Sequence, residues 1–294
     1  MRVAIVQSCY IPWKGYFSLI DLADHFVLYD DVQYTRDWRN RNRIRTSTGA
    51  QWISIPIAAK GHRFQRVRDA QVIEPGWAER HWRTLRHHYR QAPHFSEIAP
   101  AFEEAYARAG EETHLSEING RFLRLMAGML KISTPLHWSM EFPLVEGRTA
   151  RLVDLCRQLG ADEYLTGPAA RCYLDESLFA EAGIRVLWME YSGYSEYSQV
   201  HGSPCLHQVT AIDLLMNLGI ERAAAYMADF RALAEARLQV PSTIAASTAA
   251  ASTNAASTAA GSPSASPPAM GPVAGRPQPG APPEPSSSWQ GDAV

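Results

Sequence analysis

Short apolar runs alternate with longer segments of helical periodicity along the first 238 residues. Runs rich in Val and Ile over 2–7 and 25–29 predict buried strands, and the apolar spacing over 16–23 predicts a helix between them. A strand, a turn containing Pro12 and Gly15, a helix and a second strand form a βαβ unit. Because the alternation continues downstream, we expect an α/β fold with a mostly parallel, Rossmann-like sheet flanked by helices.

The later elements follow the same two periodicities. Strands are predicted over 51–57, 67–72, 164–166 and 184–189, and helices over 75–90, 99–109, 115–130, 149–159, 177–182 and 211–218. Three of these helices end at a glycine, the residue that most readily adopts the backbone conformation found just after a helix. These glycines are Gly160, Gly183 and Gly219.

The C-terminal residues 239–294 differ in composition from the rest of the chain. They are mostly Ala, Ser, Thr, Pro and Gly, and Trp289 is the only aromatic. Such a segment buries too little apolar surface to offset its ordering entropy, so a disordered tail is predicted, with a tether or docking segment as the alternative. The expected organisation is one α/β domain over 1–238 followed by this tail.

Charge is distributed unevenly and favours a small anionic ligand. The whole chain has a net charge of −2, but residues 33–90 contain thirteen Lys or Arg against four Asp or Glu. A nucleic-acid-binding protein is usually basic overall, so a local excess of positive charge indicates a site for an anionic small molecule. The alternative for part of this excess is a solvated helix face over 80–90.

Cysteine, histidine and hydropathy patterns narrow the class of protein further. The four cysteines lack paired spacing and are predicted to be free thiols in a reducing compartment. No histidine pair has a helical ligand spacing with a third ligand nearby, so no metal site is predicted. The N-terminal apolar run is too short for a signal peptide and no segment approaches the length of a membrane span. We therefore expect a cytoplasmic protein.

Two groups of polar and aromatic residues follow the first two predicted strands. Gln7, Tyr10 and Lys14 follow the first strand. The second group comprises Asp30, Asp31, Gln33, Tyr34, Asn40, Arg41, Asn42 and Arg43. Because ligands of open parallel sheets bind beyond the carboxyl ends of the strands, the two groups are expected to converge on a ligand.

The chemistry of the second group suits recognition of an anion. Asp30 and Asp31 are adjacent, so their side chains point to opposite sides and only one can face the site. Arginine offers a fork for phosphate or carboxylate, and asparagine offers both a donor and an acceptor. The alternatives are a salt-bridged loop for the arginines and plain packing for the aromatic residues of the first turn.

Two further groups follow later strands. Thr166, Gly167 and Arg171 combine close backbone approach with a guanidinium group, which would suit phosphate or carboxylate. Tyr194, Tyr197 and Gln199 could hold a sugar or an amide, or the tyrosines could cover an edge of the core. Cys172 could act as a nucleophile only beside a base that the sequence does not place.

Taken together, these stretches resemble the WbqC-like protein family. The matching elements are the Gln7…Pro12…Gly15-Tyr16-Phe17 start, 29–34, 40–44, 165–169, Arg171, Tyr173-Leu174 and Tyr194…Tyr197…Gln199, and the resemblance covers about 1–220. The family occurs among genes for O-antigen and related surface polysaccharides, and a glycine-transferase role has been suggested for a member. Ser8 departs from the family, whose members usually have Pro at this position.

The resemblance implies a transferase that forms an amide between an amino-acyl group, such as glycine, and a nucleotide-linked amino sugar. Asp30 or Asp31 would orient the acceptor amine or act as general base, Gln7 and Tyr34 would position the acyl carbonyl, and residues 39–43 would hold a phosphate-bearing group. The expected partners are the amino-sugar nucleotide and an acyl donor. No nucleic acid is expected.

The cofactor stays unknown. ATP is possible because the first βαβ unit is also similar to adenylating amide ligases such as pantothenate synthetase, although their phosphate-binding histidines are absent here. The rival functions are a non-catalytic sugar-nucleotide-binding or scaffold protein and a metal-independent glycosyltransferase. The adjacent Asp30 and Asp31 fit the DxD spacing of a metal-dependent glycosyltransferase poorly.

Overall fold

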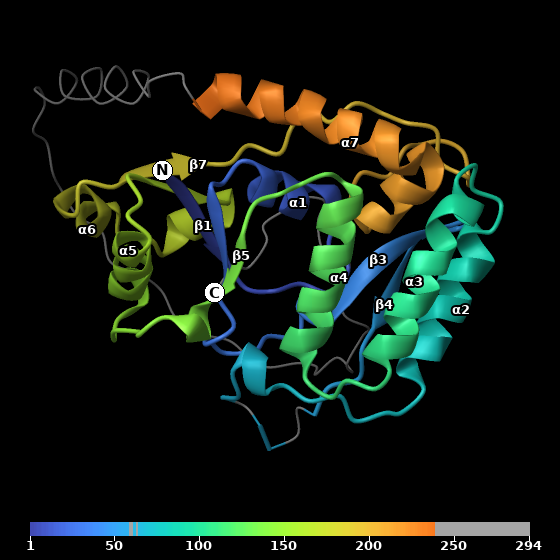
Figure 1. Ribbon diagram of the computed structural model, residues 1–294, viewed down its shortest axis with the longest axis horizontal. Coiled ribbons are helices and arrows are strands. Elements are labelled where there is room, and N and C mark those ends of the chain that lie inside the picture. The colour runs from blue at the N-terminus through green and yellow to red at the C-terminus, as the bar shows by residue number, and fades with distance from the viewer. Residues whose placement is uncertain (59–60, 63, 239–294) are drawn as a thin grey trace, which may run out of the picture. The chain divides into compact units, whose positions relative to one another are not determined.

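A computed structural model describes residues 1–58, 61–62 and 64–238. At its centre lies a five-stranded sheet with strand order β5-β2-β1-β6-β7, and each neighbouring pair is parallel (Figure 1). The strands are β1 (Arg2–Val6), β2 (His25–Leu28), β5 (Leu136–Trp138), β6 (Glu163–Thr166) and β7 (Arg185–Trp188). This arrangement confirms the predicted α/β fold with a parallel sheet. The predicted tail over 239–294 lies outside the described residues.

The two faces of the sheet bury different groups of side chains, because successive residues of a strand point to opposite faces. Val3 and Ile5 of β1 pack with α5 (Arg148–Gln158) and α6 (Glu176–Glu181) on one face. Ala4 belongs to the larger core on the other face, where the other α-helices of the described chain pack. These helices are α1 (Lys14–Asp21), the neighbouring pair α2 (Trp77–Tyr89) and α3 (Phe95–Ala109), α4 (Leu115–Met129) and α7 (Ala211–Leu238).

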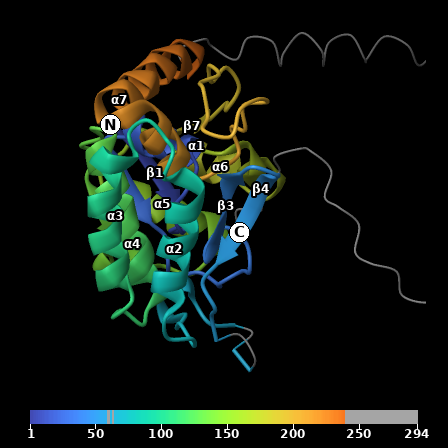
Figure 2. The ribbon, with the colours of Figure 1, turned by 90° about the vertical axis from the view of Figure 1, so that its right-hand side faces the viewer.

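A separate two-stranded antiparallel sheet lies beside α2 (Figure 2). It consists of β3 (Arg41–Thr46) and β4 (Gly49–Ser54), paired so that Arg43 lies opposite Trp52. The sequence predicted only the second strand, because the density of Arg and Asn over 40–43 resembled a loop. Short 3₁₀ helices complete the described elements: η1 (Val67–Asp69), η2 (Ser139–Glu141) and η3 (Pro168–Cys172).

The predicted elements differ most from the structure at η1, β5 and α7. The strand expected over 67–72 is wrong, since η1 occupies its first half and only isolated bridges follow. The three-residue strand β5 was too short to stand out. The helix expected over 211–218 does stop at Gly219, whose φ of 75° and ψ of 171° are not helical, but α7 then resumes and continues to Leu238.

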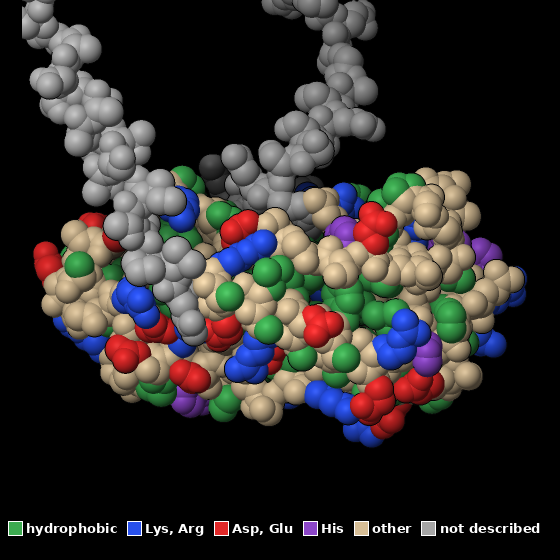
Figure 3. Space-filling model, turned by 90° about the horizontal axis from the view of Figure 1, so that it is seen from above, with side chains coloured by type: hydrophobic (Ala, Val, Ile, Leu, Met, Phe, Trp, Pro, Cys, Tyr) green, Lys and Arg blue, Asp and Glu red, His purple; other side chains and the backbone are tan. Residues whose placement is uncertain are grey.

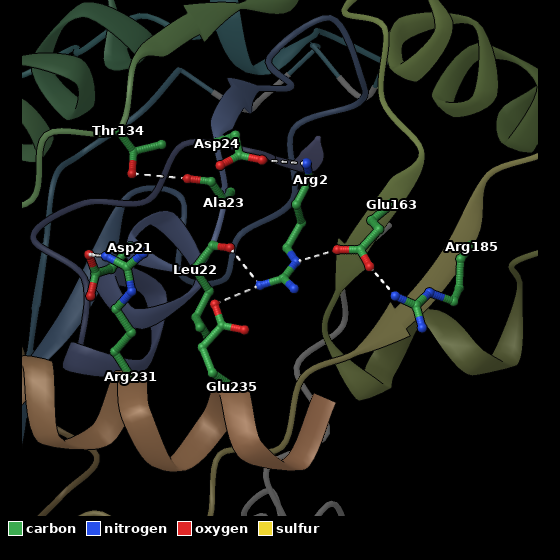
Figure 4. A network of polar contacts seen from close by, with 10 residues as sticks. All are labelled: Arg2, Asp21, Leu22, Ala23, Asp24, Thr134, Glu163, Arg185, Arg231 and Glu235. Atoms are coloured by element: carbon green, nitrogen blue, oxygen red, sulfur yellow. Dashed lines mark hydrogen bonds and ion pairs between the residues drawn. The ribbon is translucent and has the colours of Figure 1, made fainter. Parts of the chain in front are cut away.

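A polar network joins the beginnings of the strands to α7 (Figure 4). The Arg2 guanidinium donates to Glu163 at 2.9 Å, to the Leu22 carbonyl at 3.0 Å and to Glu235 of α7 at 2.9 Å. Arg231, one turn earlier on α7, pairs with Asp21 at 3.1 Å. This network lies at the amino ends of β1 and β6, so it stabilises the edge of the sheet opposite to the expected ligand site.

The outer face around α7 carries interspersed acidic and basic side chains where it is uncovered (Figure 3). No helix in the described part of the chain is both long enough and apolar enough to cross a membrane.

Candidate functional site

The chain reverses its direction across the sheet at β1. From β1 it passes to β2 and then β5 on one side, and it later returns to β6 and β7 on the other side. In open α/β sheets ligands bind beyond the carboxyl ends of the strands at such a switch point. The loops after β1, β2 and β6, which contain three of the four predicted groups, all leave from this edge of the sheet.

Asp30 lies at the centre of a completely buried polar cluster after β2. Its carboxylate accepts hydrogen bonds from the Ser8 backbone N–H at 2.8 Å and from the Ser116 hydroxyl. The Trp138 indole N–H donates to the Ser116 hydroxyl oxygen at 3.1 Å, and Asn119 donates to the Ser8 hydroxyl at 3.0 Å. Burial raises the pKa of Asp30, although these hydrogen bonds oppose the shift. Since Asp30 is 0% exposed, its role in this structure is to join segments from β1, β2 and α4.

Asp31 points the other way, as the alternation of side chains predicts. It pairs with Arg68 at 2.8 Å and with Arg66 at 3.7 Å, and it accepts a hydrogen bond from the Ser139 hydroxyl at 2.7 Å. Both arginines are partly exposed, so this carboxylate lies nearer to solvent than Asp30 does. The Asp31 side chain is itself only 5% exposed, so solvent reaches its arginine partners rather than the carboxylate.

Arg39 holds Gln7 in a fixed orientation. Its guanidinium donates to Gln7 Oε1 at 2.8 Å and to the Cys9 sulfur at 2.9 Å, and its closest carboxylate is Asp37 at 3.7 Å. Burial raises the pKa of the Cys9 thiol to about 11, so the thiol is neutral and the guanidinium charge is only loosely compensated. A nearly buried positive charge thus lies at the carboxyl end of β1.

The segment from Tyr34 to Arg45 contains a concentration of buried polar atoms without partners. Twelve buried side-chain N or O atoms of the described residues have no hydrogen-bond partner, and six of them belong to this segment. They are Tyr34 Oη, Asn40 Oδ1 and the Nε atoms of Arg39, Arg41, Arg43 and Arg45. Buried polar groups are normally paired, so such a concentration needs a physical explanation.

The asparagines of this segment fix the backbone around it. Asn40 donates to the Ile55 carbonyl at 2.7 Å and Asn42 donates to the Tyr10 carbonyl at 3.1 Å. Arg41 and Arg43 lie on the opposite face of β3 from Asn42, over the Trp52 ring. The two asparagines thus join β3 to its neighbours, while the arginines are directed elsewhere.

Two predicted residues lie apart from this cluster. Tyr10 is completely buried, and its hydroxyl contacts His81 Nδ1 at 2.8 Å and the Tyr106 hydroxyl at 2.7 Å. Tyr10 therefore occupies a position in the core. Gln33 is exposed and forms an isolated bridge with Arg66. The roles predicted for them in binding stay predictions.

Lys14 forms a second buried site together with the residues predicted after β7. Its ammonium group donates to the His207 carbonyl at 3.2 Å and lies 5.1 Å and 5.5 Å from the ring centroids of Tyr194 and Tyr197. Gln199 and Tyr197 both donate to the Asp213 carboxylate at 2.7 Å. The structure therefore brings Lys14, Tyr194, Tyr197 and Gln199 together, around an aspartate that the sequence did not single out.

Stability should depend on the protonation of Lys14. Burial lowers the pKa of Lys14 from 10.5 to about 8, although Cys205 and Asp213 oppose the shift. Between pH 8 and 10 the unfolded chain therefore binds more protons than the folded one, so this group makes stability rise with pH. We expect the free energy of unfolding of the wild type, relative to Lys14→Met, to rise by about 2 kcal/mol from pH 8 to pH 10 in urea titrations. Parallel pH curves for the two proteins would contradict the assignment.

The residues after β6 are not gathered at one point. Thr166 is buried at the end of β6, and a side chain at Gly167 would come within 3.5 Å of the Tyr191 hydroxyl. Arg171 is exposed and stacks on Trp188 at 4.3 Å. Within the described residues no three His, Cys, Asp or Glu side chains are placed to hold a metal ion together.

Comparison with known proteins gives the chain its family. The model described as the WbqC-like protein family matches residues 7–225, which include every candidate group above. The chain belongs to the WbqC-like protein family. An uncharacterized protein of Mycobacterium tuberculosis (strain ATCC 25618 / H37Rv), Rv1507c, is 48% identical over 223 residues, which are 75% of this chain and 95% of that protein. No solved structure matches the chain.

Several residues of this WbqC-like protein that build the site were not singled out from the sequence. Ser116, Asn119 and Trp138 come from α4 and β5, more than 80 residues after Asp30. Arg39 was considered only as part of its positively charged loop. No local pattern in the sequence signals contacts over such separations.

Proposed function

We propose that this WbqC-like protein is an amide-forming transferase that passes an amino-acyl group, of the glycine type, to the amine of a nucleotide-linked amino sugar used for surface polysaccharides. The observation that carries the proposal is the concentration of unpartnered buried polar atoms between Tyr34 and Arg45. These atoms supply one hydroxyl, one amide oxygen and four guanidinium N–H groups. An anionic group of the substrate would accept hydrogen bonds from the hydroxyl and the guanidinium groups, and a substrate N–H or O–H would donate to the amide oxygen. Membership of the WbqC-like family supports a role in surface-polysaccharide synthesis.

The acyl carbonyl would be held by Tyr34 and Gln7. Burial raises the pKa of Tyr34 to about 12, so its hydroxyl keeps its proton at neutral pH and can donate. Gln7 is fixed by Arg39, whose positive charge favours the oxyanion that develops when an amine attacks an acyl carbon. Donors that are already in place contribute most to catalysis, because they need no reorganisation during the reaction.

Asp31 would orient the attacking amine. Asp30 is enclosed by Ser8 and Ser116, whereas Asp31 is buried beside Arg68, which is partly exposed, so a substrate that displaced this arginine would reach Asp31. Its carboxylate accepts a hydrogen bond from Ser139 and pairs with Arg68, so we assign it an orienting role. As the amide bond forms, a glycyl thioester donor would release its thiol, whereas glycine activated with ATP as a glycyl adenylate would release AMP.

The test is product formation, followed by mass spectrometry. The full chain is incubated with UDP- or dTDP-linked amino sugars and with glycine plus ATP or a glycyl thioester, and the expected product is the glycyl amide of the sugar nucleotide. Asp31→Asn is expected to lower turnover about tenfold through loss of orientation. Asp229→Asn, which removes one carboxylate from an exposed position of α7, is the control and should match the wild type.

Two outcomes would contradict parts of this proposal. Unchanged turnover in a folded Asp31→Asn variant would remove Asp31 from the mechanism. Binding of the sugar nucleotide without product for any donor would favour the non-catalytic, pathway-organising protein instead.

A further inference from the structure

The outer face of the β3–β4 hairpin carries two tryptophans and two arginines in contact. Trp38 and Trp52 lie 4.8 Å apart between ring centroids, with an interplanar angle of 45°. The Arg41 guanidinium lies 4.5 Å from the Trp52 ring centroid. Arg43 lies 5.4 Å from Trp52 and 5.5 Å from Trp38. We call these four residues the Arg–Trp platform.

The positive charge of this platform is not neutralised within the described structure. Five arginines lie between Arg36 and Arg45, and among the described carboxylates only Asp37 comes within 4.0 Å of any of them, namely of Arg39. Arg45 is 5% exposed and donates to the carbonyls of His201 and Gly202 rather than to a carboxylate. The platform and its neighbour therefore produce a concentrated positive potential, which attracts anions.

Stacking leaves the guanidinium groups ready for an anion. A guanidinium that lies flat on an aromatic ring keeps its N–H donors in its own plane, where they can form paired hydrogen bonds to phosphate. Among the described residues Arg43 donates to Gln208 Oε1 at 2.9 Å, and the buried Nε atoms of both arginines have no hydrogen-bond partner, so the terminal N–H groups are the donors that a ligand would meet. The stack thus orients the donors without consuming them.

The spacing of the two arginines suits a ligand with two neighbouring anionic groups. Arg41 and Arg43 are two residues apart on one strand, so their Cα atoms are separated by about 7 Å. Both guanidinium groups lie over the same Trp52 ring, at 4.5 Å and 5.4 Å from its centroid, so two neighbouring phosphates could each contact one of them. Trp52 is 41% exposed, which leaves part of its ring for the nucleoside or sugar attached to that diphosphate.

We infer that the Arg–Trp platform is the subsite for the diphosphate of a nucleoside diphosphate, with Arg41 and Arg43 as the phosphate ligands and Trp52 as their support. This inference rests on the proposed function, because it names the part of the substrate that this face recognises. It adds Trp38 and Trp52 as determinants of binding. It also places the anionic end of the substrate on the hairpin rather than on the parallel sheet.

The experiment measures binding by calorimetry on the full chain, without any acyl donor. UDP is the probe, and UMP and uridine are compared with it. UDP should bind most tightly, UMP more weakly and uridine undetectably. Arg41→Gln and Arg43→Gln should each raise the Kd for UDP about tenfold. Arg157→Gln, which removes the same charge from an exposed position of α5, should leave the Kd within twofold of the wild type.

Tryptophan emission provides a second readout that reports the ring itself. Titration with UDP should change the emission of the wild type, and Trp52→Phe should lose most of this change while it keeps most of the affinity. Trp52→Leu, which removes the aromatic support, should raise the Kd several-fold. Unchanged emission on saturation with UDP would overturn the assignment of Trp52.

The inference fails if UDP binds equally well to the wild type, Arg41→Gln and Arg43→Gln, or if it does not bind at all. It also fails if an RNA oligonucleotide binds in an Arg41-dependent manner and UDP does not. Its failure can be distinguished from failure of the proposed function. If UDP binding depends on the Arg–Trp platform but no amide product forms, the inference stands and the transferase proposal fails. If Arg41→Gln and Arg43→Gln bind UDP as tightly as the wild type and the amide product still forms, the transferase proposal stands and the inference fails.

Discussion

Replacement of Asp30 by alanine is expected to lower the free energy of unfolding by about 4 kcal/mol, because it leaves two buried donors without an acceptor and a small cavity. The donors are the Ser8 N–H and the Ser116 hydroxyl. Asp30→Asn should cost only about 1 kcal/mol, because the amide oxygen can still accept a bond. Burial raises the pKa of Asp30, so ionisation of this carboxyl lowers the stability of the folded state, and the neutral amide of asparagine avoids that cost.

The measurement is urea unfolding followed by circular dichroism. Ser116→Ala provides a milder variant in case Asp30→Ala does not fold, and it should lose about 1–2 kcal/mol. Asp229→Ala on the exposed face of α7 is the control, with an expected change below about 0.5 kcal/mol. If Asp30→Ala were as stable as Asp30→Asn, the buried cluster would not be what holds the ends of β1 and β2 together.

Replacement of Gly219 by alanine is expected to lower the free energy of unfolding by about 3 kcal/mol, since its backbone conformation is essentially restricted to glycine. Its φ of 75° and ψ of 171° interrupt α7. A Cβ atom there would lie 2.4 Å from Nδ1 of His94, so the imidazole would have to move. The His94 N–H donates to the Met216 carbonyl at 3.0 Å, which ties this break to the start of α3.

Gly128→Ala is a matched control with the opposite expected sign. Gly128 lies inside α4, and a Cβ atom there would meet nothing within 4 Å. Alanine should therefore stabilise the helix by about 0.5–1 kcal/mol. Melting temperatures and urea midpoints of the two variants should move in opposite directions. A Gly219→Ala variant with the melting temperature of the wild type would show that the break in α7 is not required.

Periodicity predicted most of the fold because the strands and helices of the two cores are long enough to show it. It failed where tertiary contacts override a local pattern. β3 contains three arginines and an asparagine, which resemble a polar loop, yet Ile44 and Asn42 on its inner face are buried. The second half of α7 buries Ala223, Met227, Phe230 and Ala234, a helical spacing that continues past a glycine expected to end the element.

The sequence indicated the residue types of the candidate site, whose chemistry stays a prediction, but not how the structure assembles them. The residue types around Asp30 and Arg41 indicated recognition of a polar anion, and the structure places them on loops and a hairpin that hydrogen bonds join. The sequence could not show that Asp30 bonds Ser116 whereas Asp31 bonds Ser139 and partly exposed arginines, because these partners come from distant segments. It also could not show that Tyr10 belongs to the core, because its partners come from α2 and α3.

The position of β1 at the middle of the sheet also affects how the protein can form during synthesis. Among the described strands β1 is synthesised before the others, but it needs β6, since Arg2 pairs with Glu163 across a separation of 161 residues. At typical translation rates the unpaired side of β1 waits on the order of ten seconds for that partner. Val3 and Ile5 are exposed to other nascent chains during that time. The central strand of the sheet is therefore one whose pairing is completed late, and we expect contacts of its apolar side chains with other unfolded chains to compete with folding.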